Sequence, residues 1–380
     1  MAITFADTER ENAWRQDVRA FIDAEAPREP RTGVRQRPSF EHWRGRLASR
    51  GWIAPAWPRK FGGAEMTVVE QFIMNEEFAE AGLPTGAGVG GLGVMMLGPT
   101  LIEHGTEGQQ AEHLGRILRG EAVWCQGYSE PGSGSDLASL QTRAVRDGDD
   151  YVVNGQKIWT TVGHLADWMF MLVRTDPEAP KHRGISYLLV DMKSPGITVR
   201  PLTTLAGTQT FSEVYFEDVR VPVSNRVGEE NRGWYVGTTT LDFERSSIGS
   251  AIGLRKSLEE LVAKAKGGTG LSLVPGSQAR WEFVERWVET EVARMLSYRV
   301  VSMQAHKIIP NHEASISKMY TTELSQRIAR LGLHLRGMHG NVRDDYSMEY
   351  METVSATIAG GTTEIQKGIV ATRGLGLPRG

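Results

Sequence analysis

The spacing of apolar residues changes twice along this chain, and that change limits the folds available to it. Before Ala122, apolar residues recur every three or four positions, which is typical of amphipathic helices. From Ala122 to Gly228 they occur in short runs separated by turn-forming residues, which is typical of strands. After Gly228 the helical spacing returns. The order predicts a helical domain (1–121), a β-domain (122–229) and a C-terminal helical domain (230–380).

Helix starts and ends are marked in the N-terminal domain. The pattern of a capping box, in which Ser or Thr and a Glu or Gln three residues later satisfy each other's backbone amides, occurs three times. The pairs are Thr8 and Glu11, Thr67 and Glu70, and Thr106 and Gln109. Glycines follow the ends of the second and third of these helices, as expected for helix C-caps. The expected helices cover residues 8–25, 40–50, 67–81 and 106–119.

Short strands and turn signals alternate in the middle domain. The expected strands cover residues 123–128, 142–145, 151–153, 168–174, 185–192, 197–202 and 211–221. Asp147-Gly148, Asn154-Gly155 and Pro195-Gly196 provide turns between them. Several short strands with frequent turns predict a small antiparallel sandwich or barrel, of which we expect the β-barrel.

Four long helices are expected after the β-domain. They cover residues 234–265, 277–306, 313–336 and 348–372, with the main break at 267–276. Long consecutive helices with short connections predict a four-helix bundle. The whole chain is therefore expected to have a multi-domain α+β fold.

Composition and charge exclude several classes of function. The net charge of −3 over 380 residues leaves no basic excess for binding nucleic acid. The nine histidines lack metal-ligand spacing, so no metal is expected. Apolar runs such as Trp168–Val173 are far shorter than the roughly 18 residues that cross a bilayer, so no membrane span is expected.

The single cysteine, Cys125, indicates a reducing compartment. It cannot form an intramolecular disulfide, and Met1 to Asp7 lack the pattern of a secretory signal, so a cytoplasmic protein is expected. Cys125 lies in an apolar run without a nearby His or Lys. It is interpreted as a buried structural thiol rather than a nucleophile.

The stretch from Gln126 to Leu140 combines three glycines, four serines and two carboxylates directly after an apolar run. Glycines permit tight turns and a close approach of the backbone to a ligand. Ser129, Ser133 and Ser135 offer hydroxyl and amide groups to a ligand rich in acceptors, such as a flavin edge or a phosphate. Composition alone fits an ordinary surface turn as well.

A second motif, Lys157-Ile158-Trp159-Thr160-Thr161, follows one predicted hairpin later. The two motifs together resemble the flavin-binding signature of the acyl-CoA dehydrogenase family, whose order of domains also resembles that of this chain. The resemblance implies a noncovalently held FAD, with the loop over the flavin ring and the start of the acyl-CoA thioester. The implied cofactor contacts are Gln126, Tyr128, Ser129, Gly134, Ser135, Trp159 and Thr161, and Ser135 would also contact the substrate.

The residue that removes the α-proton of an acyl-CoA is usually, in this family, a glutamate near the carboxyl terminus. The segment Ala359 to Gln366 resembles that motif but carries Gly360 at the position of the base. A minority of the family, including isovaleryl-type, long-chain-type and bacterial steroid side-chain members, has the base in a Leu-Asp-x-Glu-Arg context on an earlier helix. Leu241 to Arg245 matches that context, so the resemblance implies that Glu244 is the catalytic base.

Other interpretations of these residues stay open. By residue type alone, Glu244 would more often be an exposed glutamate that pairs with an arginine along its helix. Arg245 either lies near the substrate or only holds its helix. The family resemblance also places Gly360 at the substrate, where its backbone N–H would polarise the thioester carbonyl.

The C-terminal domain departs from the family pattern at residues that would reach a neighbouring subunit's FAD. The implied cofactor contacts there are Arg280, Phe283, Gly337, Thr362 and Glu364. Val284 and Glu291 stand where the family commonly has Gly and Gln, and Met338 replaces the second glycine of a Gln-x-x-Gly-Gly segment. These departures leave two assemblies open, a homotetramer and an α2β2 heterotetramer whose subunits share FAD unequally.

The resemblance as a whole implies α,β-desaturation of an acyl-CoA to the 2,3-enoyl-CoA, with electrons passed to an electron-transferring flavoprotein. The sequence resembles actinobacterial members that act on bulky or branched acyl groups, including steroid side chains. Two alternatives stay open: an acyl-CoA oxidase that uses O₂, and a non-catalytic, FAD-sharing subunit of a heteromeric acyl-CoA dehydrogenase.

Overall fold

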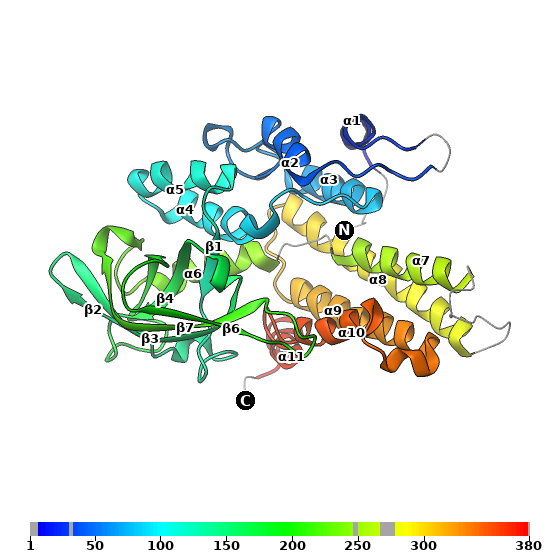
Figure 1. The fold of residues 1–380 in the computed structure, drawn as a ribbon. Helices are drawn as coiled ribbons and strands as arrows, with labels where there is room; N and C mark the ends of the chain where they lie inside the picture. The colour runs from blue at the N-terminus through cyan, green and yellow to red at the C-terminus, as the bar shows by residue number, and fades with distance from the viewer. Residues whose placement is uncertain (1–6, 30–32, 246–249, 267–277, 379–380) are drawn as a thin grey trace. The chain divides into compact units, whose positions relative to one another are not determined.

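The computed structural model describes residues 7–29, 33–245, 250–266 and 278–378 (Figure 1). For residues 241–245, 250 and 266 it describes the backbone alone. Two compact units are present. One comprises Met1–Trp43, Met66–Thr85 and Arg245–Gly380, and the other comprises Arg44–Glu65 and Gly86–Glu244.

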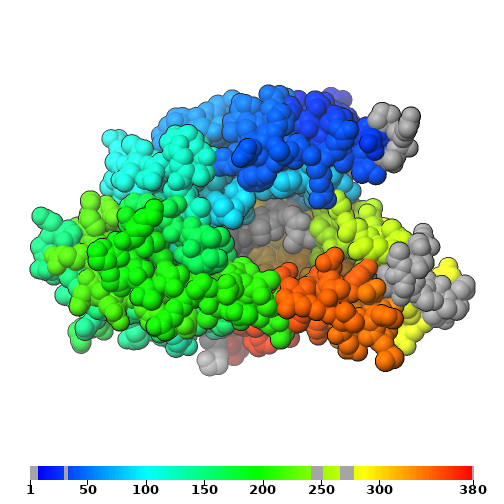
Figure 2. Space-filling model, viewed as in Figure 1, coloured from blue at the N-terminus to red at the C-terminus, as the bar shows by residue number. Residues whose placement is uncertain are grey.

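The unit that contains residues 86–244 is built around one sheet. Its strands are β1 (Trp124–Gly127), β2 (Arg143–Asp147), β3 (Asp150–Thr161), β4 (Trp168–Arg174), β5 (Ile185–Asp191), β6 (Ile197–Leu202), β7 (Phe211–Pro222) and β8 (Arg226–Val227). Their order is β6-β7-β3-β2-β4-β5-β8, and β1 also pairs with β4. Figure 1 shows the labelled strands side by side in shades of green, and the green atoms of this part of the chain lie together in the space-filling view (Figure 2).

The sheet is open and mixed, so the predicted closed antiparallel barrel is wrong. The two strands at its ends, β6 and β8, do not pair with each other. Moreover, β1 and β2 both run parallel to β4, and β2 meets it only at Arg143 and Arg174. Because β2 also pairs with β3, the sheet continues through β2 and ends at β6 and β8 without closing.

The Asn154-Gly155 pair was expected to be a turn, but β3 continues through it from Asp150 to Thr161. Its pairing with β7 shifts register between Val153 and Gly155, which identifies a β-bulge. Gly155 has φ +149°, and a Cβ there would lie 2.6 Å from Thr142 Oγ1. Glycine is therefore required by a close approach within the sheet and not by a hairpin turn.

Helices accompany the sheet in the same unit. They are α4 (Gly98–His104), α5 (Glu107–Arg119) and α6 (Gly233–Arg245), together with most of α2 (Phe40–Ser49). The expected capping box at Thr106 and Gln109 is present, and Gly120 has φ +70° at the end of α5. The Gln109 side chain also donates to Ser224 O and Arg226 O, which attaches α5 to the start of β8.

The second unit combines two N-terminal helices with the C-terminal ones. Its helices are α1 (Glu9–Glu25), α3 (Val68–Ala81), α7 (Ser250–Lys266), α8 (Gln278–Ala305), α9 (His312–Leu335), α10 (Asp345–Ala356) and α11 (Thr363–Ile369). Both remaining capping boxes are confirmed. Leu258, Leu261, Leu324 and Leu331 join α7 and α9 in a common core. Phe72 of α3 packs on Tyr298 of α8, with ring centroids 4.6 Å apart.

Two of the expected long helices are divided. The helix predicted over 348–372 is interrupted between α10 and α11, where Gly360 and Gly361 have φ of +63° and +93°. Left-handed backbone cannot continue an α-helix. The segment predicted as one helix over 234–265 contains α6 and α7, which belong to different units, and residues 246–249 between them lie outside the described part.

Cys125 is fully buried, and burial raises the pKa of its thiol. This confirms the interpretation as a structural thiol, because a reactive cysteine needs an accessible thiolate. No helix among the described ranges is both long and apolar enough to span a bilayer.

Candidate functional site

The loop after β1 is held by its own hydrogen bonds. The backbone N–H of Glu130 donates to Ser133 O at 2.9 Å, and that of Ser133 donates back to Glu130 O at 3.0 Å. The Ser133 hydroxyl donates to Asp136 O and Leu137 O, so it stabilises the loop rather than facing a ligand. Gly134 and Ser135 lie exposed at the tip, and a Cβ at Gly134 would meet open space.

A buried ion pair attaches this loop to β3. Lys157 Nζ lies 2.7 Å from Glu130 Oε1 and donates to Tyr128 O at 3.2 Å. The backbone N–H of Ile158 donates to Ser129 O at 2.9 Å. Lys157 is fully buried and Glu130 is 8% exposed. The two motifs that lie about 20 residues apart in the chain are therefore one structural element.

The Glu130 carboxylate accepts two further hydrogen bonds, from the backbone N–H of Gln141 at 2.6 Å and of Thr142 at 2.9 Å. Burial alone would raise the pKa of Glu130, but the charge of Lys157 and these donors lower it below its ordinary value. Burial lowers the pKa of Lys157 to about 8, against the attraction of Glu130. At neutral pH both groups are therefore mainly charged.

Sequence reasoning missed Glu130 and Lys157 as residues of the site. Both lie within the two motifs, but nothing in their spacing indicates that they pair. Charged residues are almost never fully buried unless they are paired. Their role is to connect the loop to the strand, and no sequence spacing reveals that contact.

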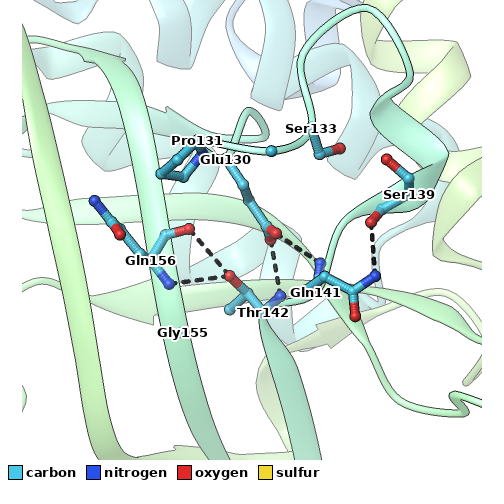
Figure 3. A pocket seen from close by; sticks show the side chains of 9 residues that line it. Glu130, Pro131, Ser133, Ser139, Gln141, Thr142, Gly155 and Gln156 are labelled. Atoms are coloured by element: carbon cyan, nitrogen blue, oxygen red, sulfur yellow. Dashed lines mark hydrogen bonds between the residues drawn. The ribbon is translucent and has the colours of Figure 1, made fainter.

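A hollow of about 460 Å³ lies beside the loop (Figure 3). It is lined by Glu130, Pro131, Gly132, Ser133, Ser139, Gln141, Thr142, Gly155 and Gln156. Figure 3 shows the Glu130 carboxylate turned toward the amides of Gln141 and Thr142, and Thr142 bonded to the backbone of Gln156. Because these lining groups already satisfy one another, the hollow is the supporting side of the loop and not a ready ligand site.

Trp159 has an unusual backbone and an exposed ring. Its φ is +59°, and the pairing of β3 with β7 shifts register between Lys157 and Thr160. The Trp159 side chain is 59% exposed. The Phe211 ring packs edge-on against it, with ring centroids 6.1 Å apart. A bulky residue in left-handed backbone costs on the order of 1–3 kcal/mol and is found mainly at functional sites.

Replacing Trp159 with glycine tests that interpretation. Glycine adopts positive φ without strain, so the free energy of unfolding without cofactor should stay within about 1 kcal/mol of wild type. Loss of an aromatic contact with the flavin should weaken FAD binding at least about tenfold, as measured by titration of flavin fluorescence.

Val145→Gly is the matched control, because Val145 is 57% exposed on β2 of the same sheet. That change should lower stability by roughly 0.5–1 kcal/mol and leave FAD affinity unchanged. An unchanged FAD dissociation constant in Trp159→Gly would contradict a flavin contact by this ring.

The other predicted flavin contacts near the loop have different surroundings. Gln126 lies on β1, and its Nε2 is buried without a hydrogen-bond partner among the described residues. The Tyr128 ring is 5% exposed and packs edge-on against Phe170 and Tyr187. Ser129 and Thr161 are half-buried beside Trp159's strand and loop. The roles of these four residues stay predictions.

These observations fit a bound flavin. The loop presents open glycine backbone at its tip, and Trp159 exposes an aromatic face from strained backbone. Gln126 has a buried donor that no described residue satisfies. A flavin ring has acceptors for such donors and a surface for such a ring. Among the described residues no group of three or more His, Cys, Asp or Glu could hold a metal ion.

Glu244 and Arg245 are the last two residues of α6. Their backbone is helical, and their side chains lie outside the described part. The structure therefore places the proposed base on a helix whose earlier turns contact the sheet, since a Cβ on Gly233 would lie 2.3 Å from the Ser186 carbonyl carbon. Neither interpretation of Arg245 is decided.

Gly360 lies in a turn before α11 that two side chains hold. Gln366 Nε2 donates to Gly360 O at 2.9 Å, and Lys318 Nζ donates to Gly361 O at 2.7 Å. Thr362 caps α11 by accepting from the Ile365 N–H. Glu364 is exposed, and hydrogen bonds from its own backbone N–H and from Thr362 lower the pKa of its carboxyl.

Three further predicted cofactor residues lie on or after α8 and α9. Arg280 is exposed near the start of α8. Phe283 is 7% exposed and packs into the core shared by α7, α8 and α9. Gly337 is exposed with φ +54° after α9. Their contact with a neighbouring subunit's FAD stays a prediction.

Sequence models of three domains match consecutive parts of the chain. They are the acyl-CoA dehydrogenase N-terminal domain at residues 8–121, the middle domain at 125–219 and the C-terminal domain at 231–375. Together these matches cover nearly the whole length.

A relative and two solved structures are similar over nearly the full chain. The acyl-CoA dehydrogenase IpdE1 of Mycobacterium tuberculosis is 37% identical over 355 residues, covering 91% of this chain and 90% of the relative. The Tcur3481-Tcur3483 steroid ACAD has a TM-score of 0.84 at 33% identity over 100% of both chains. The ChsE4-ChsE5 complex of Mycobacterium tuberculosis has a TM-score of 0.79 at 34% identity, covering 99% of this chain and 100% of the other.

Proposed function

Because the chain belongs to the acyl-CoA dehydrogenase family, whose members are FAD-dependent oxidoreductases, we propose that it desaturates a bulky acyl-CoA with Glu244 as the base. The observation that carries the assignment of the base is the turn at Gly360. This position has no side chain and a φ of +63°, a backbone region that a glutamate would enter only with strain.

The alternative carboxylate, Glu364, is poorly suited to proton abstraction. It is exposed to water, and its hydrogen bonds lower the pKa of its carboxyl. A base that removes a proton from a weakly acidic carbon works better when it is desolvated and more basic. Glu244, at the end of α6 in the Leu-Asp-x-Glu-Arg context, is the remaining candidate.

The chain's residues would divide the reaction among them. The Glu244 carboxylate takes the proton from the carbon next to the thioester, and the Gly360 N–H donates to the thioester oxygen as negative charge develops there. Ser135 would border the thioester from the loop, while Gln126, Gly134, Trp159 and Thr161 would hold the cofactor. FAD, when bound, supplies the acceptor for the hydride from the β-carbon.

The proposed substrate class is a CoA ester with a bulky group such as a steroid side chain. It is supported by similarity to a structure named a steroid ACAD. Anaerobic mixing of the FAD-loaded protein with octanoyl-CoA, isovaleryl-CoA and a steroid side-chain CoA ester tests it. Fastest flavin bleaching by the steroid ester is expected, and fastest bleaching by octanoyl-CoA would contradict the substrate class.

An electron-transferring flavoprotein is the proposed electron acceptor. The rival activity, an acyl-CoA oxidase, would release one hydrogen peroxide per substrate without an added acceptor. We expect turnover with the flavoprotein and little peroxide without it. Stoichiometric peroxide in air would favour the oxidase.

A tetrameric assembly is proposed on the basis of an apolar stripe on α8. Its five large apolar side chains are exposed by the following fractions: Trp281 66%, Val284 51%, Trp287 38%, Val288 57% and Val292 40%. Because these residues are spaced mainly by three or four positions, they lie along one side of α8. Large exposed apolar patches usually mark interfaces. Similarity to a structure named as a two-protein complex supports a heteromeric form.

The double change Val284→Asp and Val288→Asp should dissociate the assembly, because it places two charges in the proposed interface. The measurement is sedimentation velocity on the protein with any co-purifying partner. Val89→Asp is the control, since Val89 is 57% exposed, as Val288 is, but belongs to the short helix Gly88–Gly90 and not to α8. A double variant that sediments like wild type would exclude this stripe as the interface.

A further inference from the structure

Two threonines from α4 and α6 share a hydrogen bond in a fully buried position. Thr100 Oγ1 and Thr240 Oγ1 lie 2.8 Å apart, and both residues are 0% exposed. Thr100 Oγ1 also lies 2.8 Å from Met96 O in the π-helical turn before α4, and Thr240 Oγ1 lies 3.2 Å from Val236 O within α6. One hydroxyl proton must lie between the two oxygens, because two lone-pair atoms at this distance would otherwise repel.

A second hydrogen bond joins the same two helices one turn along α4. His104 Nε2 lies 3.0 Å from Thr239 Oγ1. The Thr239 hydroxyl lies 3.3 Å from Tyr235 O and donates to it. With its proton used there, Thr239 accepts from His104, which requires the tautomer with hydrogen on Nε2.

A further constraint on the position of α6 comes from its close packing against the sheet. A Cβ on Gly233 would lie 2.3 Å from the Ser186 carbonyl carbon, and one on Gly237 would lie 3.2 Å from Leu172 Cδ2. Positions 233, 237 and 240 are separated by four and three residues, so they share one face of α6. Position 244 continues that series one turn later.

We propose that Thr100 and His104 are positioning residues for the base at position 244. The inference rests on the proposed function, because it requires Glu244 to be the base. Thr240 lies four residues, or about 6 Å of helix, before position 244, so a rotation or slip at Thr240 is carried to the base. A misplacement of about 1 Å in a reacting group can reduce the rate by as much as about 100-fold.

A double valine variant distinguishes an effect of the Thr100–Thr240 hydrogen bond on the position of α6 from an effect on stability. Replacing both threonines with valine preserves shape and removes both hydroxyls, so neither threonine hydroxyl is left buried without the other. The double variant Thr100→Val with Thr240→Val should therefore keep a melting temperature close to wild type. It should nevertheless lower the rate of flavin reduction about tenfold, because the directional bond that joins Thr240 to α4 is lost.

The control for this change is Thr238→Val on the same helix. Among the residues that the structure describes, the Thr238 hydroxyl donates to Tyr235 O within α6, at 2.8 Å. The Thr238→Val variant should reduce its flavin at the wild-type rate.

His104→Gln keeps a side-chain donor, whereas His104→Leu does not, so the glutamine variant should recover most of the rate that the leucine variant loses.

Two readouts respond to positioning and not to general damage. Hydrogen exchange of the cofactor-free protein should be faster in the peptide covering 241–245 for the double valine variant, and unchanged for Thr238→Val. In the Glu244→Gln background the double valine change should cause no further loss of rate, because its effect is exerted through Glu244.

The experiment uses FAD-loaded full-length protein, anaerobic stopped flow and whichever of octanoyl-CoA, isovaleryl-CoA and the steroid ester bleaches wild type fastest. Wild-type rates in the double valine variant, equal rates in both His104 variants, or additive losses with Glu244→Gln would each overturn the positioning role. Should Glu244→Gln itself bleach at the wild-type rate, the base assignment fails, which is a separate result.

Discussion

Replacing Glu244 with glutamine is expected to slow reduction of the flavin by an acyl-CoA by at least about 100-fold, the usual effect of losing a general base. Glutamine has the size and polarity of glutamate but cannot accept the α-proton. Binding of the acyl-CoA in its ground state does not require transfer of that proton. The dissociation constant of the acyl-CoA should therefore change little. Single-turnover bleaching of the flavin under anaerobic conditions measures the rate directly.

The control for Glu244→Gln is Glu121→Gln. Glu121 is an exposed carboxylate that pairs with Arg119, so its replacement should leave both the rate and the FAD content at wild-type values. A Glu244→Gln variant that bleaches as fast as wild type would exclude Glu244 as the base. Attention would then pass to Glu364 or to a residue of a partner chain.

Replacing Lys157 with methionine is expected to lower the free energy of unfolding by about 3–5 kcal/mol, because it leaves the Glu130 charge buried without its counterion. The Glu130 carboxylate would keep only the amides of Gln141 and Thr142. Since Lys157 also donates to Tyr128 O, the loop should loosen and the variant should lose FAD during purification. Urea unfolding and the absorbance ratio of flavin to protein are the two measurements.

Lys193→Met is the matched control for the buried lysine. Lys193 lies 3.1 Å from Asp167, but its side chain is 78% exposed, so the same change should cost less than about 1 kcal/mol. Adding Glu130→Leu to Lys157→Met removes the unpaired charge and should restore part of the lost stability. FAD should still be lost, because the apolar pair cannot bond the amides of Gln141 and Thr142. A Lys157→Met variant as stable as Lys193→Met would contradict the buried pair.

Local signals in the sequence determined much of this fold. Thr8, Thr67 and Thr106 predicted helix starts that the structure confirms, because a capping box needs only residues three positions apart. The strand limits at 168–174 and 197–202 also agree, since turn residues next to an apolar run are local features. The loop motif and the strand motif indicated the family because each is a short local pattern.

Contacts between distant residues were decided by the tertiary structure alone. The sheet is open because its end strands, β6 and β8, do not pair with each other, and pairing partners are not encoded in the spacing of any single strand. Likewise α6 belongs with the sheet and not with α7, because Gly233, Gly237 and Thr240 meet neighbours far away in the chain. The burial of Glu130 against Lys157 is of this kind too.

The sequence by itself therefore determined most of the helices and strands, and it supplied the motifs for which a chemical role is proposed. Only the tertiary structure decided how the strands pair, that Trp159 takes left-handed backbone, and that one buried ion pair joins the two motifs. The physical reason is that capping, periodicity and turns act over a few residues. Strand pairing and burial depend on segments that come together only when the whole chain folds.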